Sequence, residues 1–178
     1  MSIKKQNDCA SKVIIILGSS RSDGNTKSAI KQLDPDNQIS FVDLNNLNIT
    51  PFDYQHKNQK DDYIPLMKRI VLFDHIILAT PVYWYTMSAQ MKIFIDRLSD
   101  LLTIEKETGR LLRGKKLSVL ASYTTSLPEG FELAFSQTCK YMGIDYSGCF
   151  FFYSGEDKIL MQKNVTISEF RSRVLDYE

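Results

Sequence analysis

The stretch VIIILGSSRSDGNT occupies residues 13–26 and decides how the rest of the chain is interpreted. Its first part, Val13 to Leu17, is a continuous apolar run rich in isoleucine, which is typical of a strand buried on both faces of a parallel sheet. A polar loop follows, and after it we predict a short helix from Thr26 to Leu33. Pro35 ends that helix because proline disfavours helical geometry in the residue before it. A buried strand, a polar loop and a helix therefore open the chain.

The same alternation of strands and helices continues to the other end of the chain. Further strands are predicted at Ile39 to Asp43, at His75 to Ala79, at Leu117 to Ala121 and in a segment that Cys149 to Tyr153 ends. Further helices are predicted at Asp61 to Phe73, Ser88 to Leu102, Phe131 to Met142 and Ser168 to Leu175. Alternation forces parallel pairing, because the chain must cross back over the sheet before each new strand. We therefore expect an α/β fold, a three-layer doubly wound domain with a five-stranded parallel sheet.

Composition narrows the class of protein. The 178 residues are 43% hydrophobic and 24% charged, as in a soluble globular protein, and we expect one domain over 1–178 with a flexible or peripheral segment at 1–12. A net charge of +1 without a basic run argues against nucleic acid as a partner. No apolar stretch approaches the roughly 18 residues that span a bilayer, and 1–12 has no signal-peptide core, so we expect no membrane partner.

The cysteines and histidines indicate a cytoplasmic protein without a metal site. The three cysteines, Cys9, Cys139 and Cys149, are scattered and form no CxxC pair. We interpret them as buried free thiols in a reducing compartment, and therefore predict a cytoplasmic protein. His56 and His75 lie far apart in the sequence and complete no metal-binding set, so no metal site is expected.

In a doubly wound sheet the ligand lies beyond the carboxyl ends of the strands, which selects the loops 18–25, 80–87 and 122–130. The first loop carries several hydroxyl groups, a guanidinium and an amide at the start of a helix, where the helix dipole favours an anion. Its polar residues are Ser19, Ser20, Arg21, Ser22, Asn25 and Thr26. The glycines match neither GxGxxG nor a Walker A loop, and no cysteine nucleophile is present. We predict a cradle for a monoester phosphate; the alternative is a plain turn in which Asn25 caps the helix.

The second loop places three consecutive aromatic residues, Tyr83, Trp84 and Tyr85, on a predicted surface. So much apolar area is rarely exposed on a loop unless something flat covers it, and Pro81 stiffens the approach. The alternative is that one or two of these rings pack on neighbouring helices or on a second subunit. Together with a phosphate cradle, the aromatic loop favours a planar phosphorylated cofactor.

At these two loops the sequence resembles the NADPH-dependent FMN reductase family of the flavodoxin-like superfamily. The resemblance rests on Gly18-Ser19-Ser20-Arg21, Gly24-Asn25-Thr26, Thr80-Pro81-Val82-Tyr83-Trp84, Ser88-Ala89, Lys92 and Phe94-Ile95-Asp96-Arg97. It implies a flavodoxin-like sheet with strand order 2-1-3-4-5. Iron–sulfur flavoproteins share both loops but carry a cysteine cluster after strand two. The segment NITPFDYQ at 48–55 has no cysteine, which excludes such a centre.

The resemblance also implies a cofactor, FMN, and the residues that bind it. Around the phosphate and the start of the ribityl chain it places Ser19, Arg21, Asn25 and Thr26, in a loop that also holds Ser20 and Gly24. Around the isoalloxazine it places Pro81, Val82, Tyr83 and Trp84. The third loop, with Ser122, Tyr123 and Thr124, would contact the pyrimidine end of the ring, although it departs from the glycine-rich form of many relatives. Family precedent further implies a homodimer or a higher homo-oligomer.

The function expected from these features is NAD(P)H oxidoreduction. FMN would accept hydride from NADPH or NADH and pass electrons to a quinone, a free flavin or a similar small-molecule acceptor. Because the cofactor performs the redox chemistry, no protein side chain is predicted to be catalytic. Two alternatives stay open: a flavodoxin-type electron carrier without NAD(P)H activity, and a flavodoxin-like module that binds no flavin.

Overall fold

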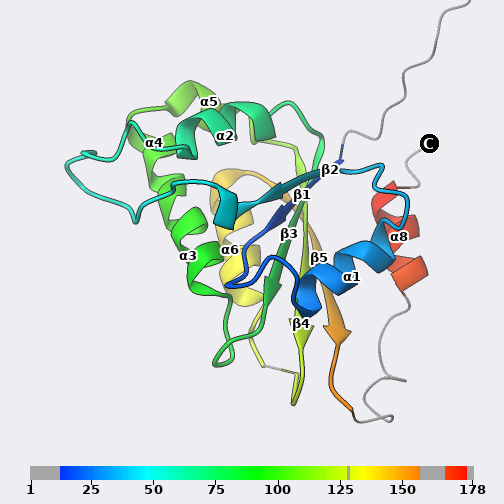
Figure 1. Ribbon diagram of the computed structural model, residues 1–178. Helices are drawn as coiled ribbons and strands as arrows, with labels where there is room; N and C mark the ends of the chain where they lie inside the picture. The colour runs from blue at the N-terminus through cyan, green and yellow to red at the C-terminus, as the bar shows by residue number, and fades with distance from the viewer. Residues whose placement is uncertain (1–12, 128, 157–166, 176–178) are drawn as a thin grey trace, which may run out of the picture.

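Five parallel strands form one sheet in the order β2-β1-β3-β4-β5 in the computed structural model (Figure 1). The strands are β1 (Val13–Leu17), β2 (Ser40–Asp43), β3 (His75–Pro81), β4 (Lys116–Tyr123) and β5 (Asp145–Tyr153). The order confirms the predicted doubly wound sheet. The structure describes residues 13–127, 129–156 and 167–175, so the prediction for residues 1–12 lies outside it.

Helices cover both faces of the sheet and make three layers (Figure 1). One face packs against α1 (Asn25–Leu33) and α8 (Ile167–Leu175), and the other against α2 (Tyr63–Ile70), α3 (Ala89–Asp96) and α6 (Leu133–Met142). Alternation along β1 explains the two cores, because successive side chains of a strand point to opposite faces. Ile14 and Ile16 join the α2–α3–α6 core, whereas Ile15 and its odd-numbered neighbours join the α1–α8 core.

The predicted helix from Ser88 to Leu102 is interrupted, and this prediction was wrong in its continuity. The chain forms α3, then the 3₁₀ turn η2 (Arg97–Ser99), then the short α4 (Asp100–Thr103), and a further unpredicted helix, α5 (Lys106–Arg110), follows. The interruption occurs at Arg97, which is fully buried and donates from Nε to Asp100 Oδ2 over 2.6 Å. The turn therefore places an arginine and a carboxylate in contact inside the protein.

The same arginine fastens the long connection between β2 and α2, which begins with the 3₁₀ turn η1 (Leu44–Asn46). Arg97 donates to both carboxylate oxygens of Asp61 and, over 2.9 Å, to the backbone oxygen of Thr50. His56 Nδ1 lies 3.0 Å from Asp100 Oδ1. One buried guanidinium thus fixes residues 50–61 against the end of α3.

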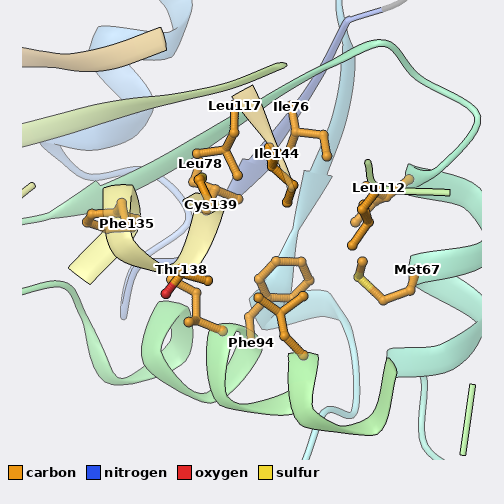
Figure 2. A pocket seen from close by; sticks show the side chains of 13 residues that line it. Met67, Ile76, Leu78, Phe94, Leu112, Leu117, Phe135, Thr138, Cys139 and Ile144 are labelled. Carbon is orange, nitrogen blue, oxygen red and sulfur yellow. The ribbon is translucent and has the colours of Figure 1, made fainter. Parts of the chain in front are cut away.

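A small apolar cavity lies in the core between the sheet and the helices α2, α3 and α6 (Figure 2). Its volume is about 30 Å³, which is about the room of one water molecule. Figure 2 shows Leu78 and Leu117 of the sheet, Phe94 of α3 and Cys139 of α6 around it. It is too small and too apolar for a nucleotide cofactor, which needs several hundred Å³.

The cysteines in the described residues are free thiols. Cys139 is buried, which raises the pKa of its thiol to about 12, and Cys149 is partly buried. The predicted buried free thiol is confirmed for Cys139, and Cys9 lies outside the described residues. Among the helices that the structure describes, none has the length and apolar character needed to cross a membrane. Nor does any group of three histidine, cysteine or carboxylate side chains in the described ranges assemble as a metal site.

Candidate functional site

The loops after β1, β3 and β4 lie side by side at one edge of the sheet, because these strands are parallel neighbours (Figure 1). The strand ends are in register, with Leu17 beside Ala79 and Pro81 beside Ser122. Backbone hydrogen bonds of 2.8 Å extend the pairing into the loops, from Gly18 N to Ala79 O and from Val82 N to Ser122 O. The sheet thus brings together the three segments that the sequence predicts as a ligand site.

Ser88 joins the first loop to the second, a role that sequence reasoning missed. It is fully buried and caps α3, since its Oγ accepts from Met91 N over 3.2 Å. The same Oγ donates to Gly18 O over 2.7 Å, and the Ser88 amide donates to Thr80 Oγ1 over 3.0 Å. A Cβ on Gly18 would lie 2.9 Å from Met91 Cβ, so only glycine allows the first loop this close to α3. A serine directly before a helix was the available signal.

The start of α1 faces the site without a capping side chain. Its N-cap is Gly24, which has an extended backbone, and Asn25 is the first helical residue. The alternative in which Asn25 caps the helix is therefore wrong. The first N–H groups of α1 have no intrahelical partner and carry the positive end of the helix dipole. Arg21 Nη2 lies 3.4 Å from the point that a Cβ on Gly24 would occupy, which places the guanidinium beside this helix start.

Arg21 is the one cation in the loop of residues 18–26. Its side chain is exposed, and its guanidinium forms no ion pair or hydrogen bond with the residues that the structure describes. The nearby Lys27 instead places its Nζ 3.4 Å from the ring centroid of Phe41, and partial burial lowers the pKa of this lysine. Arg21 is therefore the cation available to an anion at the start of α1.

Two buried hydroxyl groups connect the first loop to the third. Thr26 Oγ1 lies 2.6 Å from Ser122 Oγ, and both residues are almost fully buried. This bond fixes the first turn of α1 against the end of β4, although 96 residues separate the partners in sequence. Asn45 supports the first loop from the other side, where its Nδ2 donates to Ser19 O over 2.6 Å. Asn45 was also missed, and its place two residues after β2, the neighbour of β1, was the only signal.

The aromatic residues of the second loop form a tight two-residue turn. Tyr83 and Thr86 exchange two backbone hydrogen bonds of 2.9 and 3.0 Å, and Trp84 and Tyr85 occupy the turn between them. Trp84 is 93% exposed. The alternative in which these rings pack on neighbouring helices therefore fails for Trp84. Tyr83 is partly exposed, and its hydroxyl lies 2.9 Å from Ser20 Oγ, which links the aromatic turn to the first loop.

The third loop combines buried and exposed side chains. Ser122 is buried against Thr26, and the Tyr123 ring packs against Phe151 and Tyr153 in the interior. Burial also raises the pKa of the Tyr123 phenol. Thr124 is exposed at the rim. Of the predicted residues in this loop, Thr124 alone points its side chain to solvent, so Tyr123 can reach a ligand only through its backbone.

Comparisons with known proteins agree with this arrangement. The family model for NADPH-dependent FMN reductase matches residues 11–142. A Bacillus subtilis (strain 168) protein named as an NAD(P)H-dependent FMN-containing oxidoreductase, YwqN, is 34% identical over 97 residues. That alignment covers 51% of this chain and 54% of YwqN, so the chain matches about half the length of this relative.

Two solved structures show the fold. The Trp repressor binding protein from Bacillus subtilis superposes with a TM-score of 0.70 at 22% identity, covering 93% of this chain and 98% of that one. A flavodoxin from Megasphaera elsdenii superposes with a TM-score of 0.59 at 14% identity, covering 93% and 99%. The sheet order and the site at its carboxyl edge thus define a flavodoxin-like protein. More narrowly, the chain belongs to the NADPH-dependent FMN reductase family, an oxidoreductase family with FMN as its cofactor.

Proposed function

We propose that this protein is an FMN-dependent oxidoreductase that takes hydride from NADH or NADPH and reduces a quinone, a free flavin or a similar small acceptor. The observation that supports it most is one juxtaposition: an uncapped helix start with hydroxyl groups and an exposed arginine lies next to an exposed aromatic turn. FMN, when bound, supplies the ring that accepts hydride and gives up electrons. The overall reaction balances as NAD(P)H, a proton and a quinone giving NAD(P)⁺ and a quinol.

The residues of the first loop fit a monoester phosphate. The N–H groups of α1 and the hydroxyl of Ser20 are hydrogen-bond donors, and Arg21 adds a positive charge beside them. Ser19 and Thr26 are buried and hold the loop in shape through Asn45 and Ser122. The proposal therefore gives Ser20, Arg21 and the helix start the direct phosphate contacts.

The second and third loops fit a flat ring. Pro81, the last residue of β3, and Val82 after it both pair with Ser122, which makes a rigid floor, and Tyr83 and Trp84 follow at the rim. These residues bind and orient the ring and shield one side of it from water. No side chain of the site is assigned a proton-transfer role, in keeping with a reaction in which the cofactor performs the chemistry.

Three wider features belong to the same proposal. Residues 1–178 act as a single FMN-binding domain, and the protein works in the cytoplasm, where free thiols such as Cys139 persist. It forms a homodimer whose second subunit helps to cover the flavin. Sedimentation with and without FMN tests the dimer.

Replacing Arg21 with alanine is expected to weaken FMN binding by about 2 kcal/mol, roughly 30-fold, because a charge-assisted hydrogen bond to phosphate is lost. Riboflavin, which lacks the phosphate, should bind the parent and the variant alike. Flavin titration measures both affinities. Arg69→Ala, which removes an exposed arginine on α2, is the matched control and should change neither. If the parent binds riboflavin as tightly as FMN, the first loop does not hold a phosphate.

Anaerobic mixing of the FMN-loaded protein with excess NADH or NADPH is expected to bleach the visible absorbance of the flavin. Adding a naphthoquinone should restore it. The hydride donor needs a flat surface beside the flavin, and the exposed turn at Tyr83 and Trp84 offers one. A flavin that stays oxidised with both nucleotides, yet is reduced by dithionite, would identify an electron carrier instead.

A further inference from the structure

The turn at Trp84 and Tyr85 has a backbone conformation that its residues disfavour. Trp84 has φ of 48° and Tyr85 has φ of 66°, so both lie in the left-handed region. A two-residue turn with positive φ at both central positions is the type I′ turn, which strongly prefers Asn-Gly. Bulky residues rarely adopt positive φ, because Cβ approaches the backbone too closely. Two adjacent aromatic residues therefore hold a conformation that glycine and asparagine would adopt with less strain.

Little contact within the protein offsets this strain. Trp84 is 93% exposed and Tyr85 is 68% exposed, so neither ring is buried in the core. The turn is held from its base, by the two backbone bonds between Tyr83 and Thr86 and by the hydroxyl contact from Tyr83 to Ser20. Strained residues that persist without stabilising the fold cluster at ligand-binding sites. The benefit of the two rings must therefore come from something that binds to them.

The position of the turn indicates what binds. It follows β3 at the carboxyl edge of the sheet and is joined to the phosphate-binding loop, so a ligand on the rings would lie at the rim of the cofactor site. Exposed aromatic rings at adjacent positions of one turn suit a flat aromatic molecule better than an ionic or a bulky one. A second copy of the chain, which the proposed function places over the flavin, would also bury the rings, and the oligomeric state of the variant described below tests that alternative.

We propose that Trp84 and Tyr85 form a two-ring platform that selects planar aromatic electron acceptors over non-planar ones, at a cost to the stability of the fold. This inference rests on the proposed function and goes beyond it, because it names the shape of the acceptor and adds Tyr85 to the site. Trp84 and Tyr85 are specificity residues, not catalytic ones. A substitution that relieves the strain should therefore raise the stability of the protein and lower its selectivity for planar acceptors. Substitution of a merely structural turn would not change the selectivity.

The double substitution Trp84→Asn/Tyr85→Gly tests the platform, because it installs the preferred type I′ pair. Relief of the strain should raise the Tm of the protein without FMN by about 4 °C. In the FMN-loaded protein, reduced beforehand with dithionite, reoxidation by 1,4-naphthoquinone should slow at least tenfold, whereas reoxidation by ferricyanide, which is not planar, should slow less than threefold. Calorimetric titration with naphthalene-2-sulfonate, a flat molecule that accepts no electrons, should show weaker binding to the variant.

Asn37→Gly is the matched control, since Asn37 also has a positive φ, of 52°, and lies between α1 and β2, away from the site. It should change neither acceptor rate. Equal loss of rate with both acceptors, or unchanged naphthalenesulfonate affinity, would overturn the platform. So would an unchanged Tm, or a dimer in the parent that becomes a monomer in the double variant, because the rings would then serve an interface. Failure of the parent to bind FMN at all would instead reject the proposed function. The Tm and naphthalenesulfonate measurements do not depend on FMN binding, so they test the platform separately.

Discussion

Replacing Arg97 with methionine is expected to lower the free energy of unfolding by about 3–5 kcal/mol, which is a large share of the total stability of a domain. Methionine fills much of the same volume but leaves two carboxylates, Asp61 and Asp100, buried without their cation. Arg97 is fully buried, and the two carboxylate side chains are 4% and 1% exposed. Burial disfavours the charge on Asp61, yet hydrogen bonds from Arg97, Thr50 and Tyr63 hold the pKa of this carboxyl below its ordinary value. Urea unfolding followed by far-UV circular dichroism measures the loss.

Two further variants separate the buried network from a general effect of losing an arginine. Arg110→Met removes an arginine whose ion pair with Glu107 is exposed, and it should change the free energy of unfolding by less than about 1 kcal/mol. Adding Asp61→Asn and Asp100→Asn to Arg97→Met should recover part of the stability, because the amides need no cation. If the triple variant is no more stable than Arg97→Met, the cost does not come from the unpaired carboxylates.

Acidification from pH 7 to pH 4 is expected to lower the free energy of unfolding by about 3 kcal/mol through one residue, His75. Burial, together with the charge of Lys116, lowers the pKa of His75 from 6.5 to about 4. Above pH 6.5 the imidazole is neutral in both states, so it does not favour unfolding. Between pH 6.5 and 4 the unfolded chain takes up a proton that the folded protein does not, and stability therefore falls as the pH falls. Below pH 4 both states are protonated and this contribution becomes constant.

The measurement compares the parent with His75→Gln at each pH, so that acid effects on carboxylates cancel. The difference between the two free energies of unfolding should change by about 3 kcal/mol across this range. Ser118→Ala removes the hydroxyl that lies 2.8 Å from His75 Nε2 but leaves the ring buried, and it should keep the pH dependence. Parallel curves for the parent and His75→Gln would show that burial does not depress this pKa.

Much of the fold could be predicted from the sequence because its signals are local. The isoleucine run of β1 shows a strand buried on both faces, and alternation with helices fixes parallel pairing. The interrupted helix could not be predicted in this way. Periodicity continues smoothly through residues 88–102, and the interruption at Arg97 depends on Asp61, which lies 36 residues away. Only the folded chain shows that these two side chains meet.

The candidate site, like the fold, could be predicted only where its signals are local. The hydroxyl groups and the aromatic run are visible as unusual residues in loops, and the sheet places both loops at one edge as predicted. The residues that fasten the loops were not visible, since Ser88, Asn45 and the Thr26–Ser122 pair act through contacts between distant segments. The type I′ turn was also hidden, because its sequence, Trp-Tyr, is not one that normally indicates such a turn.

The exposure of Trp84 has a practical consequence for optical studies of this protein. It is the only tryptophan in the chain, and its indole is surrounded by water in the folded state almost as it would be in an unfolded chain. Its emission maximum should therefore hardly shift when the protein unfolds, and intrinsic fluorescence would overlook the transition. A flat absorbing molecule beside the same indole would quench that emission strongly. The fluorescence of Trp84 should therefore report whether the site is occupied, but it should hardly change when the domain unfolds.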